Sequence, residues 1–422
     1  MTSLFYTRYL KPPPSTANLG KSFTIAWTVA NDLGEISYWE PLTVYCRLIT
    51  TNHPSLGLLL DKSNNNKKYS KNTDSNNATL TSEVIRRATT SVKLEYDPVK
   101  GGGIMTHSLA IVNTTNNSGS IRNTTNTNGV TVQLVLELSD QLPGHPIWTN
   151  ARSLMMDDDV CSWVIPVYSL PIQVLLSPST LSTTSQYSNN NNDNNIHDYE
   201  RRVTIHRFGA SSANQQQDLF IHEDASPSIG SHIWDCGMLM CQYLAEKYGI
   251  PHFDRILELG SGTAIAGLYA AHILQPSIIY LTDLEDTVPT IQRSVSLLEG
   301  DPLIKNVKII VKELEWGKPL ILSDQRNKKK RKTEQEFDGF VDMVLLTDVL
   351  YNPSFHDALI NTLQQLININ PKMKILLGYK PRDEGEERTF FDKIKTNLGW
   401  EWEMSLLPPA EIYWITRSTN AA

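Results

Sequence analysis

The chain has 422 residues, 40% of them hydrophobic and 20% charged, and its formal net charge is −7. This composition is typical of a globular protein with two or three domains. It disfavours a nucleic-acid partner, because nucleic-acid-binding proteins normally present a basic face. No apolar stretch is long enough for a membrane-spanning helix, so no membrane partner is expected either.

The four cysteines, at positions 46, 161, 236 and 241, show neither metal-site spacing nor a disulfide framework. They are interpreted as buried free thiols in a reducing compartment, and no metal site is expected. The first eight residues lack the basic start and apolar run of a signal peptide. The expected location is therefore the cytoplasm.

Residues 1–175 show the period-two alternation of β-strands, most clearly at 22–30, 42–49 and 130–138. This region predicts an all-β sandwich of the immunoglobulin or C2 type. Asparagine- and threonine-rich stretches at 64–77 and 113–128 are expected to be disordered loop insertions. The acidic triplet at 157–159 either binds calcium or forms a solvated turn, and the turn is favoured because no other carboxylate cluster joins it.

A low-complexity linker is predicted over 176–200, followed by a second domain over 201–422 that folds independently of the sandwich. It opens with a hairpin and a helix from 230 to 247. Strands and helices then alternate, which predicts a parallel doubly wound α/β sheet that ends in an antiparallel hairpin. The expected strands are 256–259, 278–282, 307–311, 343–347, 375–378, 403–407 and 411–415, and the expected helices are 263–272, 289–299, 354–367 and 386–397.

The first strand of this domain runs into a glycine turn at Gly260 and Gly262, and a small-residue helix follows. Such a turn lets backbone amides approach a nucleotide-like ligand. Asp283 ends the next strand, where a carboxylate binds ribose hydroxyls. Glu258 precedes the glycines and would repel a pyrophosphate, so the pattern favours cationic S-adenosylmethionine over a dinucleotide, and methyl transfer over hydride transfer.

Several further motifs occur in a fixed order around this turn. They are Trp234-Asp235, Glu258 with Gly260 to Thr263, Thr282-Asp283, Glu315-Trp316-Gly317, Thr347-Asp348 with Tyr351, and Tyr379 to Arg382. Together they resemble the seven-β-strand protein-lysine methyltransferases over roughly residues 218–416. The resemblance implies a Rossmann-like methyltransferase sheet, S-adenosylmethionine as cofactor and a lysine-bearing protein as substrate.

The resemblance also implies roles for individual residues. Asp348 would accept a hydrogen bond from the substrate amine, and Tyr351 would line the channel or donate to the site. The cofactor would be bound by Trp234, Glu258, Gly260, Ser261, Gly262, Thr263, Asp283, Leu284, Trp316 and Thr347. Alternatives from the residues alone are a helix cap for Asp348 and a core position for Trp234. Arg382 could pair with Asp348, shape the mouth of the site or form a surface ion pair.

The sequence departs from the family pattern in two places. Ala264 stands where glycine is usual, which fits if the backbone φ there is negative. The Asn-x-x-x-Asn pattern after the second strand is absent from residues 292–298, which leaves part of the cofactor rim or the substrate mouth unassigned. The second departure does not put the glycine turn itself in doubt.

Two other functions stay open. One is a methyltransferase that acts on another nucleophile, such as histidine or a small molecule. The other is a catalytically silent binding module, in which the N-terminal β domain recruits a partner. A monomer is expected. The basic run at 328–332 is either a solvated charged loop, a contact for an acidic partner or a nuclear-import signal, so the nucleus is an alternative location.

Overall fold

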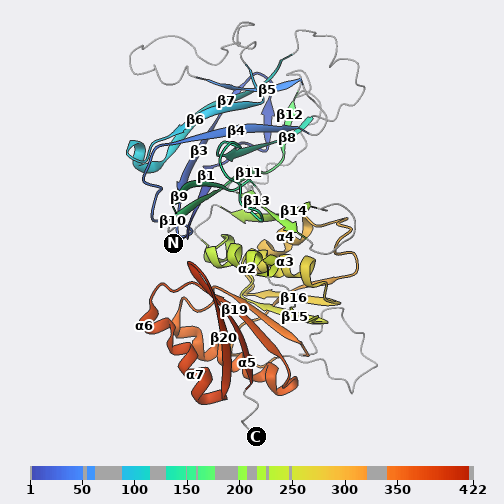
Figure 1. The fold of residues 1–422 in the computed structure, drawn as a ribbon. Coiled ribbons are helices and arrows are strands. Elements are labelled where there is room, and N and C mark those ends of the chain that lie inside the picture. The colour runs from blue at the N-terminus through green and yellow to red at the C-terminus, as the bar shows by residue number, and fades with distance from the viewer. Residues whose placement is uncertain are drawn as a thin grey trace.

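The computed structural model describes residues 2–50, 55–61, 88–114, 130–148, 150–157, 160–175, 198–206, 216–224, 228–246, 250–320 and 340–417. Figure 1 shows a β-sandwich at one end of the molecule and a separate sheet with its helices at the other. The fold class expected from the sequence, a Rossmann-like methyltransferase sheet preceded by an all-β region, is confirmed. In these ranges, no helix is both long and apolar enough to cross a membrane.

The N-terminal part consists of two sheets that face each other across one hydrophobic core. Buried side chains from both sheets, including Trp27 and Leu134, meet in this core. Within the described ranges the first sheet has the order β5-β7-β3-β1-β10-β9, and the second has β14-β13-β11-β8-β12-β2, with β4 paired to β8 and β6 paired to β4. The strands are β1 (Thr2–Lys11), β2 (Thr16–Asn18), β3 (Ser22–Ala30), β4 (Leu42–Thr50), β5 (Leu56–Leu60), β6 (Ser91–Tyr96), β7 (Met105–Asn113), β8 (Val130–Glu137), β9 (Arg152–Asp157), β10 (Val160–Ile165), β11 (Val167–Ser169) and β12 (Ile172–Leu175).

The expected hairpin at the start of the second domain is present as β13 (Asp198–His206) and β14 (Gln216–Asp224). The sequence did not indicate that this hairpin pairs with a strand of the sandwich. Strand β13 pairs with β11, so the hairpin extends the second sheet of the sandwich. Buried Ile221 of β14 also belongs to the core of the second domain. The hairpin therefore joins the two parts of the chain.

The second domain is built on a sheet whose order is β17-β16-β15-β18-β19-β21-β20. The first five of these strands are parallel, and β21 and β20 form the predicted antiparallel hairpin. The strands lie within two or three residues of their expected positions. They are β15 (Arg255–Leu259), β16 (Ile278–Asp283), β17 (Lys308–Glu313), β18 (Met343–Thr347), β19 (Lys374–Tyr379), β20 (Trp400–Leu407) and β21 (Ala410–Arg417).

Helices cover both faces of this sheet, because each central strand buries side chains on both sides. Ile256 packs toward α2, α3 and α4, whereas the next residue, Leu257, packs toward α5 and α7. The α-helices are α2 (Asp235–Glu246), α3 (Ile265–Leu274), α4 (Val288–Ser296), α5 (His356–Ile369), α6 (Glu384–Glu387) and α7 (Thr389–Leu398). Short 3₁₀ turns occur at η2 (Lys100–Gly103), η4 (Ile229–Ser231) and η5 (Pro353–Phe355).

The sandwich and the methyltransferase-like domain share one hydrophobic cluster. Leu4 and Trp148 of the sandwich lie in the same cluster as the buried faces of α2 and α3. The Trp148 indole also donates a hydrogen bond to the Met238 carbonyl, at 3.1 Å. The sequence analysis expected the two parts to fold independently, whereas in the structure they share this core. The boundaries 1–175, 176–200 and 201–422 stay a prediction.

A buried ion pair reinforces this junction. The guanidinium of Arg201, on β13, pairs with the carboxylate of Glu223, on β14, and both side chains are fully buried. Arg201 also donates to the carbonyls of Thr7 and Pro166, and Glu223 accepts the Ile233 amide at 2.8 Å. The pair therefore links the sandwich to the segment that leads into α2.

Several sequence features lie outside the described residues: the loop at 64–77, most of the loop at 113–128, most of the linker, and the basic run at 328–332. The same holds for two residues of the acidic triplet at 157–159. All four cysteines are free, and those at 46, 236 and 241 are buried as expected, whereas Cys161 is partly exposed.

Candidate active site

The glycine turn after β15 has the geometry that its sequence indicates. Gly260 and Gly262 both have positive φ angles, +69° and +53°. A side chain at Gly260 would stand only 3.0 Å from both the Trp316 ring and the Val349 side chain, so only glycine fits there. The turn is tied to the next strand, because Ser261 donates its amide to the Thr282 carbonyl and its hydroxyl accepts the Thr282 amide.

Ala264, by contrast, differs from expectation. Its φ is +63°, in the left-handed region, whereas a negative angle was the condition for alanine to fit. An L-residue in this region costs about 1–2 kcal/mol. The conformation persists because the side chain is fully buried and the amide donates to the Ser261 carbonyl at 2.6 Å. The helix after the turn begins at Ile265, two residues later than expected, and Thr263 is buried within the turn.

Asp283 lies at the carboxyl end of β16, directly beside the glycine turn. One carboxylate oxygen accepts the Gly262 amide and the other accepts the Leu284 amide, both at 2.8 Å. Burial raises the pKa of this carboxyl, although the two amides oppose the shift. The turn and the second strand thus form one unit, and half-exposed Leu284 borders it.

Glu258 is buried beneath the turn. Its carboxylate accepts the Gly267 amide of α3 at 2.9 Å. Burial raises the pKa of this carboxyl to about 8. Near neutral pH the group is therefore protonated in most molecules, which weakens the argument that its charge repels phosphate.

Trp316 borders the turn from the other side. It follows β17, and its ring lies against Gly260. The next residue, Gly317, donates its amide to the Thr362 hydroxyl of α5 at 2.8 Å, which fixes the segment on that helix. The Trp316 ring is thereby held beside Gly260.

Asp348 follows β18 at the same edge of the sheet. Its φ is +60°, a strained conformation for a residue that is not glycine. Both of its carboxylate oxygens accept from Arg382, at 2.7 and 2.6 Å. Of the alternatives for Arg382, the structure therefore shows the pair with Asp348. The helix cap is instead Asn352, whose side chain accepts the Ser354 amide.

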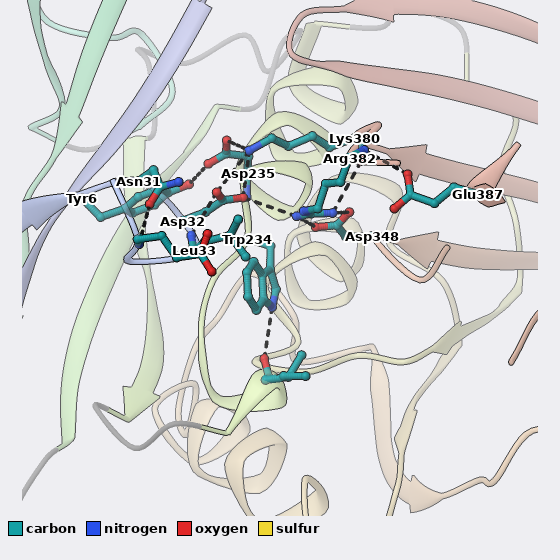
Figure 2. A network of polar contacts seen from close by, with 12 residues as sticks. Tyr6, Asn31, Asp32, Leu33, Trp234, Asp235, Asp348, Lys380, Arg382 and Glu387 are labelled. Atoms are coloured by element: carbon teal, nitrogen blue, oxygen red, sulfur yellow. Dashed lines mark hydrogen bonds and ion pairs between the residues drawn. The ribbon is translucent and has the colours of Figure 1, made fainter. Parts of the chain in front are cut away.

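Arg382 belongs to a larger network of charged side chains, shown in Figure 2. Lys380 contacts Asp32 at 3.0 Å and Asp235 at 2.7 Å, and Arg382 contacts Asp32 at 3.4 Å. Attraction from these carboxylates raises the pKa of Lys380 although burial opposes it. Burial, followed by repulsion from Asp32, raises the pKa of Asp235 to about 6.

Trp234 and Tyr351 lie beside this network. The Trp234 ring is half-buried rather than part of a core cluster, and the Arg382 guanidinium lies over it at 5.6 Å (Figure 2). Tyr351 is 45% exposed. Burial raises the pKa of its phenol, and repulsion from Asp283 and Asp348 raises it further.

The structure thus brings most of the predicted residues to one edge of the sheet. It also adds residues that sequence reasoning missed, namely Asp32 and Tyr6 from the sandwich. Tyr6 donates its hydroxyl to Asp235 at 2.8 Å. Lys380 was part of a recognised motif, but nothing in the sequence near Asp32 signalled a role in this site. Among the described residues, no group of His, Cys, Asp and Glu side chains is placed to hold a metal ion.

A fold of this strand order, with a glycine turn and an acidic residue after the second strand, defines a Rossmann-like methyltransferase. A family profile described as "Lysine methyltransferase" matches residues 213–397. The protein-lysine N-methyltransferase EFM6 of Saccharomyces cerevisiae is 31% identical over 197 residues, which cover 43% of this chain and 75% of EFM6. The chain belongs to this lysine methyltransferase family.

Two further relatives are also named lysine methyltransferases. EEF1A lysine methyltransferase 3 of Xenopus tropicalis is 30% identical, over 41% of this chain and 67% of that protein. The match to protein-lysine N-methyltransferase EFM3 of Chaetomium thermophilum covers 47% of that protein at 27% identity. Among solved structures, human N-acetylserotonin methyltransferase overlaps with 44% of this chain at a TM-score of 0.31 and 12% identity. The family match leaves out residues 1–212 and 398–422.

Proposed function

We propose that the protein transfers a methyl group from S-adenosylmethionine to a lysine side chain of a protein substrate. The observation that carries this proposal is the placement of Asp283 and Asp348 at the carboxyl ends of β16 and β18, the two strands that flank β15 and its glycine turn. Asp283 lies beside the glycine turn and accepts the Gly262 amide, whereas Asp348 is the expected acceptor for the amine. Burial, followed by repulsion from both carboxylates, raises the pKa of the Tyr351 phenol, which supports a place for this residue beside both groups.

The residues around the glycine turn fit the cofactor. Asp283 would accept the ribose hydroxyls, and Trp316 and Leu284 would border the adenine. The Thr347 hydroxyl, at the end of β18, is buried without a hydrogen-bond partner among the described residues, as expected for a group that contacts a bound ligand. Glu258 would support the turn from below rather than contact the ligand directly. When bound, S-adenosylmethionine supplies an electrophilic methyl group on a sulfonium.

The charged network fits a lysine side chain. Asp32, Asp235 and Asp348 provide three carboxylates against two cations, Lys380 and Arg382, so the ionised network has one negative charge in excess. This excess favours the approach of an ammonium group. Free lysine has a pKa of about 10.4, so it has to lose a proton before its lone pair can react. Asp348 would accept an N–H of the amine and orient that lone pair.

The test uses purified protein, S-adenosylmethionine labelled on the methyl group, and a total protein extract. We expect the label on methylated lysine after acid hydrolysis of the labelled protein band. Label on histidine, or only on small molecules, would contradict lysine as the acceptor. The monomeric state and the cytoplasmic or nuclear location stay predictions.

The Arg382–Asp348 pair favours a second candidate, a catalytically silent binding module. Asp348 is engaged on both oxygens by Arg382, and a permanently occupied acceptor could not orient an amine. In that case the protein would bind the cofactor, but no label would reach any acceptor. The same assay, combined with a measurement of cofactor binding, separates the two candidates.

A further inference from the structure

The sandwich contributes a buried carboxylate to the charged network beside the glycine turn. Asp32 lies in the loop after β3, and its side chain is fully buried. It contacts Lys380 through both oxygens and Arg382 through one, although it is separated from them by about 350 positions in the sequence (Figure 2). We propose that Asp32 is a positioning residue: it binds the Arg382 guanidinium when a substrate amine occupies Asp348. This proposal rests on the proposed function.

The first argument is competition for Asp348. Arg382 satisfies both oxygens of Asp348 at 2.7 and 2.6 Å. An amine that is oriented by Asp348 has to displace at least one of these hydrogen bonds. The Arg382 side chain is only 22% exposed, and a largely buried guanidinium that loses its carboxylate is costly because its charge is only partly solvated. The exchange therefore needs a second carboxylate within reach of Arg382.

The second argument is that Asp32 is already within reach. Arg382 Nη2 lies 3.4 Å from Asp32 Oδ2, a longer contact than either of its bonds to Asp348. A modest rotation would therefore exchange one carboxylate for the other. Among the described residues, the carboxylates that contact the Arg382 side chain are Asp32 and Asp348. The pKa of Arg382 is raised because hydrogen bonds to Asp348 and attraction from both carboxylates outweigh burial.

The third argument is that Asp32 is held rigidly. Its carbonyl accepts from Arg8 at 2.6 Å, and its carboxylate accepts the Leu33 amide at 3.1 Å. Asn31 closes the loop, since its side chain accepts the amides of Glu35 and Ile36. Lys380 fixes the carboxylate against Asp235. A carboxylate that only joined two domains would not need to share Arg382 with the proposed acceptor.

The decisive test measures the Arg382 guanidinium directly and needs no substrate. In the full chain labelled with ¹⁵N-arginine, we expect slow hydrogen exchange of the Arg382 side chain in wild type. It should stay slow in Asp348→Ala, because Asp32 then binds the guanidinium, and become fast only in Asp348→Ala with Asp32→Asn. Exchange in Asp348→Ala that is as fast as in the double variant would overturn the proposal.

Arg388 is a matched internal control. It forms a two-pronged pair with Glu411, at 3.1 and 2.9 Å, and this pair includes neither Asp32 nor Asp348. Its exchange should be the same in all of these variants. A change at Arg388 that parallels the change at Arg382 would mean general loosening of the protein, and would also overturn the proposal.

A second measurement tests whether the contact matters for transfer. With labelled S-adenosylmethionine and a total protein extract, Asp32→Asn should slow transfer about tenfold, the equivalent of one charge-assisted hydrogen bond, at unchanged cofactor affinity. Asp32→Glu should restore part of the rate. Trp148→Phe removes a hydrogen bond between the same two parts of the chain, to the Met238 carbonyl and not to Arg382, and should have little effect.

Equal losses of transfer in Asp32→Asn and Trp148→Phe would reduce Asp32 to a structural contact. Should wild type transfer no label at all, the proposed function fails, whereas the exchange measurement still decides whether Asp32 binds Arg382. The two failures are therefore distinguishable.

Discussion

Arg382 binds both carboxylate oxygens of Asp348, through Nη1 at 2.7 Å and Nη2 at 2.6 Å. The pair lies where strands β18 and β19 end, beside the glycine turn that follows β15. It joins the residue expected to orient the substrate amine to a network that extends into the sandwich. The geometry therefore links the chemistry of the methyltransferase domain to the part of the chain that the family match does not cover.

Cofactor binding should depend on Asp283. Asp283→Ala removes a carboxylate that could accept two ribose hydroxyls, so we expect about a hundredfold loss of affinity for S-adenosylmethionine. Isothermal titration calorimetry measures this loss. Asp286→Ala is the matched control, since that carboxylate is exposed in the same loop and should change little. Unchanged binding in Asp283→Ala, or binding of NAD in place of S-adenosylmethionine, would contradict the assignment.

The stability of the protein should fall with rising pH because of Glu258. Its pKa is about 8 in the folded protein and near 4.3 when unfolded. The folded state therefore holds the proton more tightly, and stability is lost between these values as pH rises. Between pH 6 and pH 8, the free energy of unfolding should fall by about 2 kcal/mol less in Glu258→Gln than in wild type. Urea unfolding at both pH values measures it, and parallel pH profiles for the two proteins would refute the prediction.

The sandwich and the methyltransferase domain should stay associated after the chain is cut between them. A protease site inserted between Leu175 and Asp198 leaves the shared core and the Arg201–Glu223 pair intact. We expect both fragments to co-elute in size-exclusion chromatography. With Glu223→Gln, which leaves the buried Arg201 charge unpaired at a cost of about 3–5 kcal/mol, the fragments should separate more readily. Fragments that separate at once in the wild type would support the independent domains expected from the sequence.

Much of the second domain could be predicted because its signals are local. The parallel strands are short apolar runs such as 343–347, and the helices between them imply the order of the sheet. The positions of the glycine turn and Asp283 could be predicted for the same reason, since both lie at strand ends; their role in cofactor binding stays a prediction. The positive φ of Ala264 was missed, because alanine itself does not indicate a left-handed conformation.

Contacts between distant segments could not be predicted. Asp32 meets Lys380 and Arg382 only after the sandwich packs on α2 and α3. Similarly, the pairing of β13 with β11 depends on the tertiary fold, because a hairpin does not reveal which sheet it will extend. The pKa of Glu258 is raised because the side chain is buried beneath the turn. The sequence indicated only that Glu258 lies in a short apolar strand, not how deeply its carboxyl is buried.

The hydroxyl of Tyr351 should contribute to transfer but not determine it. In Tyr351→Phe the ring stays and only the hydroxyl near Asp283 and Asp348 is lost. We expect less than a tenfold decrease in the transfer rate, with cofactor affinity unchanged, because one neutral hydrogen bond contributes about 1 kcal/mol. Single-turnover measurements with labelled cofactor test this. A complete loss of transfer would give the phenol a direct part in the reaction.

The most direct test compares methyl transfer and cofactor binding in Asp348→Ala. The glycine turn and Asp283 are untouched in this variant, so it should bind S-adenosylmethionine as wild type does. Without the acceptor that orients the amine, label transfer to lysine should fall about a hundredfold or more. Wild-type transfer in Asp348→Ala would contradict the central claim that Asp348 orients the lysine, and the substrate site would then have to lie elsewhere.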